Sequence, residues 1–209
     1  KKIVLFISIV VASAFFSSNA SAQGKYGADS AECIKYLSYY TEYYKQKNYE
    51  SALPNWRKAY ALCPPTARYS LLSDGTTLLR REISKSTTSP EYKKKLIDSL
   101  MTIYDQRVEY WPKYKVASLN NQALDMYNYM KNDNQALYAG LSKVIAANGN
   151  NTKPNIFLFH FNAAVNLYKD GLLDAEKLIA DYDKAIETIG SIQPKSEIEK
   201  KLIADNVEK

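Results

Sequence analysis

Histidine is almost absent from this sequence, and several short motifs of enzymatic sites are missing altogether. The chain has one histidine, His160, inside the apolar stretch FLFHF. There is no CxxCH, no glycine-rich phosphate loop and no GxSxG, so the common motifs of haem attachment, nucleotide binding and α/β-hydrolase catalysis are excluded. Cys33, Cys63 and His160 also lack the paired spacing of zinc ligands. We therefore expect a protein that is not an enzyme, with no catalytic residues, no metal and no cofactor.

Strand-like patterning is missing as well. No segment alternates apolar and polar residues over a sustained length, and glycine and proline gather at the breaks between helical patterns. These two features predict an all-α fold.

Only one long apolar run is present, and it lies at the N-terminus. Two lysines precede an apolar run over residues 3–16, and small residues follow at 20–22. This layout is typical of a secretory signal peptide over residues 1–22, cleaved after Ala22. A membrane anchor is the alternative, but the run is shorter than the roughly 20 residues that span a bilayer. We expect export to a bacterial periplasm or outer envelope, and no transmembrane segment in the mature chain.

Positive charge is in small excess. The formal net charge is +6, and the stretch Lys93-Lys94-Lys95 is the only basic cluster. A surplus of this size is weak support for nucleic-acid binding, and three consecutive lysines are typical of a solvated helix face. We expect no nucleic-acid partner.

Tyrosine, in contrast, is abundant, with 18 tyrosines against six phenylalanines. In the stretch YLSYYTEYYKQKNYE, Tyr36, Tyr40 and Tyr43 recur at spacings of four and three, which predicts one face of a helix. Asn48 interrupts this pattern, and a second helical pattern follows it. The sequence therefore predicts a helical hairpin here.

The second helix of this hairpin resembles the tetratricopeptide repeat. That family carries an aromatic residue, then alanine, an aromatic, alanine and proline at fixed spacings, and Tyr49, Ala52, Trp56, Ala59 and Pro64 occupy those positions. The resemblance is specific over residues 36 to 65 and looser beyond them. It implies an α-solenoid of stacked hairpins in place of a plain helical bundle.

The remaining helical patterns divide into further hairpins. After a lead-in over residues 23–32, we expect a tetratricopeptide-like domain over 33–209. Its four hairpins and last helix are predicted at about 33–66, 67–112, 113–153, 154–194 and 196–209.

The resemblance also implies a role for the recurring aromatic and small residues, which pack between helices in that family. The predicted packing residues are Tyr36, Tyr40, Tyr43, Tyr49, Ala52, Trp56, Ala59 and Pro64. An aromatic platform for a sugar or a nucleobase is the alternative for the tyrosines.

The other face of each first helix lines an inner groove in this family. The resemblance therefore implies a protein-binding groove, formed here by Ile34, Leu37, Thr41, Tyr44, Lys45, Arg68, Leu71, Gly75, Leu78, Leu158, Phe161, Val165 and Tyr168. In the alternative interpretation these side chains are buried beneath the chain ends or the next helix.

The two cysteines lie at adjacent ends of the first predicted hairpin. Cys33 is at the start of its first helix and Cys63 at the end of the antiparallel partner, and an exported chain permits oxidation. We predict a Cys33–Cys63 disulfide; two small buried thiols are the alternative.

The function expected from these features is a non-enzymatic scaffold or adaptor. It would bind a protein or protein segment through its helix faces, either free in the periplasm or within an envelope complex. The alternative is a small-molecule or glycan binder with an aromatic-lined pocket. Ser30 and Ser99 stand in Asp-Ser-apolar tripeptides, which are similar to glycosylation sites of some exported bacterial proteins.

Overall fold

The computed structural model describes residues 24–191, 201 and 204–205, and all the regular secondary structure of these residues is helical. The predicted all-α fold is therefore confirmed. The helices are α1 Ser30–Lys45, α2 Tyr49–Leu62, α3 Tyr69–Ile83, α4 Pro90–Tyr110, η1 Pro112–Tyr114, α5 Lys115–Met130, α6 Asn134–Asn148, η2 Gly149–Asn151, α7 Pro154–Lys169 and α8 Ala175–Ser191. The expected signal peptide lies outside the described residues, and so does most of the expected last helix.

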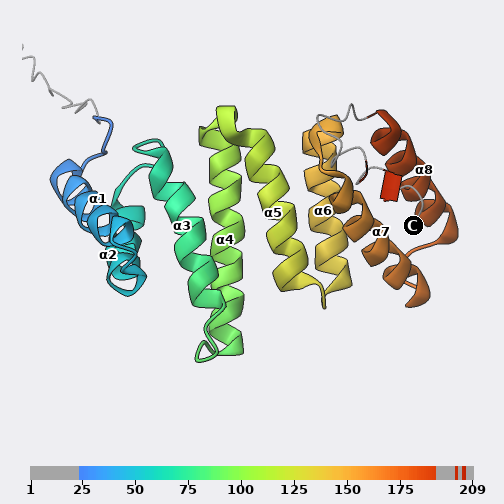
Figure 1. Cartoon of the computed structure of the whole chain (residues 1–209), viewed down its shortest axis with the longest axis horizontal. Helices are drawn as coiled ribbons and strands as arrows, with labels where there is room; N and C mark the ends of the chain where they lie inside the picture. Colours follow the sequence, from blue (N-terminus) through green and yellow to red (C-terminus); the bar gives the residue numbers. More distant parts are fainter. Residues whose placement is uncertain (1–23, 192–200, 202–203, 206–209) are drawn as a thin grey trace, which may run out of the picture.

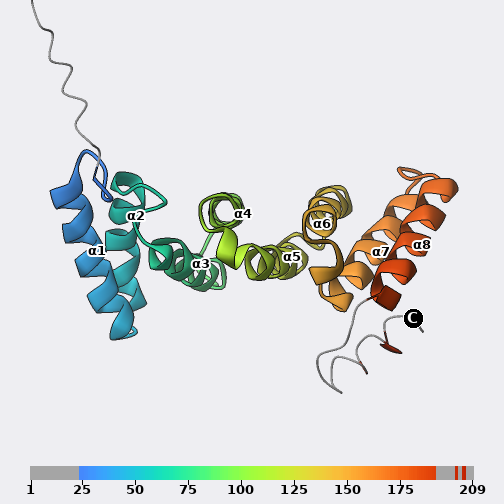
Figure 2. The ribbon, with the colours of Figure 1, turned by 90° about the horizontal axis from the view of Figure 1, so that it is seen from above.

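The helices stand side by side in an extended row. From α1 to α8 they follow one another along the longest axis of the molecule, in sequence order (Figure 1). Seen from above, α3 and α5 lie on one side of the row, and α4 and α6 lie on the other (Figure 2). Each helix packs mainly against its neighbours in the chain, and α5 also contacts α7.

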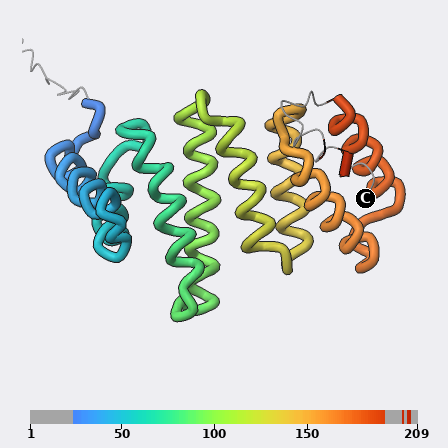
Figure 3. The backbone as a smooth tube through the Cα atoms, in the orientation of Figure 1, coloured from blue at the N-terminus to red at the C-terminus, as the bar shows by residue number. Residues whose placement is uncertain are grey.

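The chain reverses direction alternately at the two edges of this row. The turns within the four successive hairpins lie at the lower edge in Figure 3, and the connections between hairpins lie at the upper edge. Local capping explains all four lower turns, because the side chains of Asn48, Ser89, Asp133 and Asp174 each accept a hydrogen bond from a backbone N–H in the first turn of the following helix. The connections between hairpins lie near the predicted hairpin boundaries, while α1 begins at Ser30, three residues before the expected start of the first hairpin.

The eight α-helices form two units related by a constant shift along the chain. Helices α5 to α8 each begin 85 residues after the corresponding helix of α1 to α4, at Ser30 and Lys115, Tyr49 and Asn134, Tyr69 and Pro154, and Pro90 and Ala175. We call α1–α4 the first unit and α5–α8 the second unit. The structure therefore repeats every two hairpins.

Several positions that are buried in the first unit are also buried 85 residues later in the second unit, although the residue types differ. Five buried positions of α3 are Leu71, Leu72, Gly75, Leu78 and Leu79, and their equivalents in α7, also buried, are Ile156, Phe157, His160, Ala163 and Ala164. Likewise, Ala52, Trp56 and Ala59 of α2 correspond to Leu137, Leu141 and Val144 of α6. The two units therefore share a pattern of buried faces, with different side chains at these positions.

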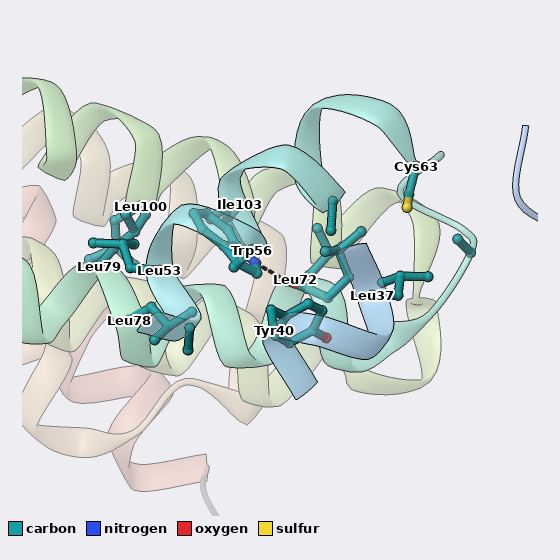
Figure 4. Close-up of a cluster of buried hydrophobic side chains, with 14 of the residues drawn as sticks. Leu37, Tyr40, Leu53, Trp56, Cys63, Leu72, Leu78, Leu79, Leu100 and Ile103 are labelled. Atoms are coloured by element: carbon teal, nitrogen blue, oxygen red, sulfur yellow. Dashed lines mark hydrogen bonds between the residues drawn. The ribbon is translucent and has the colours of Figure 1, made fainter. Parts of the chain in front are cut away.

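The core of the first unit is centred on Trp56, which lies between α2 and α3 (Figure 4). Its indole Nε1 donates a hydrogen bond to the carbonyl oxygen of Leu71 over 2.7 Å. The indole can approach this closely because α3 has glycine at the point of contact: a Cβ added at Gly75 would lie 2.4 Å from the Trp56 ring.

The predicted packing residues differ in their burial. Tyr40, Ala52, Trp56 and Ala59 are buried, while Tyr36, Tyr49 and Pro64 are half-buried. The rings of Tyr36 and Tyr49 pack against the core of the first unit. Tyr43 is 37% exposed, so the prediction that it packs between helices is wrong. It follows Tyr40 by three residues, but the buried face of α1 runs through Cys33, Leu37 and Tyr40 and ends there.

The predicted disulfide between Cys33 and Cys63 is confirmed. It joins the start of α1 to the end of α2, with the two Cα atoms 5.2 Å apart. The equivalent positions of the second unit, Ser118 and Asn148, are also buried. There, Ser118 Oγ and Asn148 Oδ1 have no hydrogen-bond partner among the described residues.

A buried polar cluster joins the two units. Arg80 of α3 donates to both carboxylate oxygens of Asp125 in α5, over 3.1 and 2.8 Å. Tyr104 of α4 donates its hydroxyl to the same carboxylate over 2.9 Å. Burial and the negative charge of Asp125 raise the pKa of Tyr104 well above its usual range. The buried carboxylate of Asp125 thus has a charged partner in the half-buried guanidinium of Arg80.

The described helices do not include a membrane span. None of them is both long enough and apolar enough to cross a bilayer.

Moving the disulfide to the second unit tests the equivalence of the units. Ser118→Cys combined with Asn148→Cys closes a loop with the same 30-residue separation as the native bridge, and it removes two buried polar atoms without partners. We expect the new bridge to raise the free energy of unfolding by about 3–4 kcal/mol. Urea unfolding of the double variant and of the unaltered protein, both oxidised, measures this difference.

Ser118→Cys alone is the matched control, because it adds a thiol without a cross-link. The variant Cys33→Ala/Cys63→Ala lacks the native bridge, and its loss in free energy of unfolding is the value with which the gain from the new bridge is compared. If the double variant keeps two extra free thiols in oxidising buffer while folded, the units are not equivalent at this position.

Candidate functional site

The residues predicted to line a groove do not form one exposed surface. Leu37, Leu71 and Leu78 are 3%, 0% and 2% exposed and belong to the core of the first unit, with buried Gly75 against Trp56. The prediction that these residues line an open groove is therefore wrong for the first unit, because this face of α1 and α3 packs against neighbouring helices. The alternative interpretation, burial beneath the next helix, is correct for them.

The other predicted groove residues reach the surface to different extents. The exposed ones are Ile34, Lys45, Arg68 and Tyr168, and the half-buried ones are Thr41, Tyr44, Leu158, Phe161 and Val165. Two of the half-buried rings have aromatic partners: Tyr44 packs edge-on against Tyr49, and Phe161 packs at a tilt against Tyr182. Only Val165 of these nine lines one of the surface hollows described below.

A surface hollow of the second unit has a volume of about 400 Å³. It is lined by residues from the end of α5, the α5–α6 turn, the start of α6 and one side of α7. The α7 residues Phe159, Asn162, Asn166 and Lys169 recur at spacings of three and four, which places them on one side of the helix. We call this space the second-unit hollow.

The second-unit hollow combines an aromatic pair with several carboxamides. The rings of Tyr127 and Phe159 stack nearly parallel, with centroids 3.8 Å apart. Asn132, Asn134, Asn162 and Asn166 also line the hollow, and Asn166 donates to the Asn134 side-chain oxygen over 3.2 Å. Carboxamides both donate and accept hydrogen bonds, so this lining can pair with groups of either kind.

The charge in this hollow is positive. Lys131 and Lys169 line it, both are exposed, and no carboxylate is among the lining residues. Neither lysine forms an ion pair with a described residue. The nearby Asp133 uses its carboxylate to cap α6, where it accepts from the N–H of Ala136.

A second hollow occupies a similar place in the first unit, with a volume of about 310 Å³. It lies between the α1–α2 turn and the end of α3. We call it the first-unit hollow. Four of its lining residues, Lys47, Tyr49, Leu78 and Arg81, lie 85 residues before Asn132, Asn134, Ala163 and Asn166 of the second-unit hollow. The same geometry therefore recurs in both units.

Two of the three cations of the first-unit hollow have partners, while the third, Lys47, forms no ion pair with a described residue. The guanidinium of Arg81 lies 4.2 Å from the centre of the Tyr49 ring, and Lys85 forms a 2.8 Å ion pair with Glu82. Glu50 adds a second carboxylate to the lining. The two hollows therefore share a position but differ in charge.

A third, smaller space of about 110 Å³ surrounds His160 between α6, α7 and α8. The His160 ring stacks on Tyr138, and its Nε2 lies 2.8 Å from Ser142 Oγ. Because Ser142 donates its own hydrogen to the Tyr138 carbonyl, it accepts from His160 Nε2–H. Above this ring, Tyr138 and Lys177 both bind the carboxylate of Asp181.

Burial makes His160 a neutral residue at ordinary pH. Burial lowers the pKa of His160 to about 4, and the nearby lysines Lys177 and Lys184 act in the same direction, while Asp181 opposes them. In this arrangement the imidazole acts as a packing residue with one hydrogen bond, as expected for a core histidine.

Comparisons with known proteins add no relative: no family model, curated protein or solved structure matches this chain. Within the described part of the chain, no cluster of three or more histidine, cysteine or acidic residues is arranged to hold a metal ion.

Reading the sequence by the repeat motif missed most of the second-unit hollow. The motif directs attention to residues at Val165 and Phe161, whereas Asn162, Asn166 and Lys169 lie on the neighbouring side of α7. The sequence holds no local signal for this hollow, because its residues come from separate elements of the chain.

The state of His160 generates a pH prediction. The unfolded chain binds a proton at His160 with a pKa near 6.5, while the folded chain does so only near pH 4. The neutral His160 therefore makes its whole contribution to the free energy of unfolding above pH 6.5. This contribution is lost as the pH falls from 6.5 to 4, by about 3 kcal/mol in total and by about 2 kcal/mol at pH 5. Urea unfolding at pH 7.5, 6 and 5 measures the loss.

His160→Gln is the control, because glutamine keeps an N–H donor for Ser142 and does not titrate. The quantity to compare is the change in its free energy of unfolding between pH 7.5 and pH 5, and not its value at pH 7.5. An equally steep loss in this variant would show that other groups cause it.

Proposed function

We propose that this chain is an exported, non-enzymatic scaffold of tetratricopeptide-like, α-solenoid architecture that binds a partner protein. The observation that carries the proposal is the recurrence of a surface hollow at the same place in both units of an extended row. Repeat proteins of this kind bind by presenting an extended surface built from successive units. The binding surface we propose is the edge of the row that carries the two hollows, which differs from the groove implied by the resemblance.

The packing of the motif residues supports the architecture. Ala52, Trp56 and Ala59 are buried between neighbouring helices, which is the role that the resemblance gives them. Each helix packs chiefly against its chain neighbours, which also supports a stacked array over a bundle with one central core.

The disulfide supports export. Stable disulfides form in oxidising compartments, and the Cys33–Cys63 bridge joins two buried cysteines at the first hairpin. A bacterial periplasm or outer envelope is the compartment we propose.

A glycan or small molecule is the second candidate ligand. The stacked pair of Tyr127 and Phe159, beside four asparagines, favours this function, because aromatic faces and carboxamides suit sugar rings and hydroxyls. The hollow's volume also lies within the range of small-molecule pockets.

Site-specific photo-cross-linking tests the scaffold proposal. A benzophenone amino acid placed at Asn162, in the second-unit hollow, should give one discrete protein adduct in the native envelope. The same probe at Glu109, an exposed residue of α4 that lines neither hollow, is the matched control. We expect the identified partner, once purified, to bind with 1:1 stoichiometry by calorimetry.

Asn162→Trp should weaken this binding, because a larger, uncharged side chain then fills the hollow, and circular dichroism should show an unchanged fold. If the Asn162 probe yields no protein adduct above the Glu109 probe, the scaffold proposal is wrong.

A further inference from the structure

We propose that the second-unit hollow binds an extended peptide segment that carries carboxylate groups. This inference rests on the proposed scaffold function and names the chemistry of the partner. It concerns the side of α7 that carries Asn162, Asn166 and Lys169.

Two lysines give the second-unit hollow a positive charge. Lys131 comes from the α5–α6 turn and Lys169 from the end of α7, so cationic groups enter the hollow from two elements. Neither ammonium group is paired with a described carboxylate, and no acidic side chain lines the hollow. Charge complementarity therefore favours an anionic ligand, and carboxylates form strong charge-assisted hydrogen bonds with ammonium groups.

The asparagines that line the hollow can bind the backbone of a peptide. A peptide backbone offers a donor and an acceptor at nearly every residue, and a carboxamide can bind either group. Asn162 and Asn132 form no side-chain hydrogen bond with a described residue, so both remain available for a ligand. Four carboxamides around one hollow can thus hold an extended segment while the lysines bind its acidic side chains.

The first-unit hollow acts as an internal comparison. It has the same position, but Glu50 and Glu82 line it. Of its three cations, Arg81 is engaged by Tyr49 and Lys85 by Glu82, which leaves Lys47 as the one without such a partner among the described residues. An acidic segment would meet two carboxylates there. The structure therefore assigns the acidic segment to the second unit, in preference to the first.

The charge also favours a peptide over an uncharged saccharide. Stacking on Tyr127 or Phe159 would suit a sugar, but each ring already covers one face of the other. A neutral sugar would also leave Lys131 and Lys169 unpaired.

Selection from a random peptide library tests the inference without knowledge of the natural partner. A displayed library of random dodecapeptides is selected on the oxidised full chain, and enriched peptides are measured by fluorescence anisotropy. We expect enrichment of Asp and Glu, and affinity about tenfold weaker for Lys131→Gln/Lys169→Gln, with a shallower salt dependence.

Two further variants separate the contributions. Asn162→Ala/Asn166→Ala should weaken the same peptides while their salt dependence stays unchanged. Lys47→Gln/Lys85→Gln, the matched change in the first-unit hollow, should leave their affinity unaltered. All three pairs alter exposed side chains, and circular dichroism checks that each variant keeps its fold.

Several results would overturn the inference: no enriched peptide, enriched peptides without an acidic bias, or acidic peptides whose affinity survives loss of Lys131 and Lys169. Binding of N-acetylchitotetraose to this hollow, in the absence of acidic-peptide binding, would assign it to a saccharide instead. These failures are distinct from failure of the scaffold proposal, because cross-linking at Asn162 reports a protein partner whatever its charge.

Discussion

The contact between Trp56 and Gly75 is the constraint on which the first unit depends. An indole ring lies against α3 at the one position where that helix has no side chain, and its N–H binds a backbone carbonyl of the same helix. Any side chain at residue 75 would occupy the space of the ring and move α2 away from α3. Because α2 also holds α1 through the disulfide and the shared core, the position of the whole first hairpin follows from this contact.

The second unit meets the same constraint with different side chains. At the equivalent positions α6 has Leu141 and α7 has His160, so a smaller residue on one helix accompanies a larger one on the other. This exchange introduces an imidazole into the core, and Ser142 and Tyr138 satisfy it by hydrogen bonding and stacking. The two units thus keep both of these positions buried, while the individual residues change.

The sequence was sufficient for the helices and for the disulfide, since both depend on local patterns. Tyrosine spacing, the asparagine break at residue 48 and the prolines that begin α4 and α7 are visible without any tertiary information. Groove prediction failed for Leu37, Leu71 and Leu78 because it depends on which neighbouring helix covers a face. The second-unit hollow was missed for a similar reason: its residues come from α5, the following turn, the start of α6 and α7, and only the tertiary arrangement brings them together.

The Cys33–Cys63 bridge also has a mechanical consequence for a chain that is held at both ends. Under tension, the segment between the two cysteines cannot be drawn out, because force passes directly through the sulfur atoms and bypasses the α1–α2 turn. The bridge spans 30 residues, so it withholds about 100 Å of contour length from extension. The second unit, with Ser118 and Asn148 at these positions, has no such lock, and the molecule is therefore unequally extensible along its length.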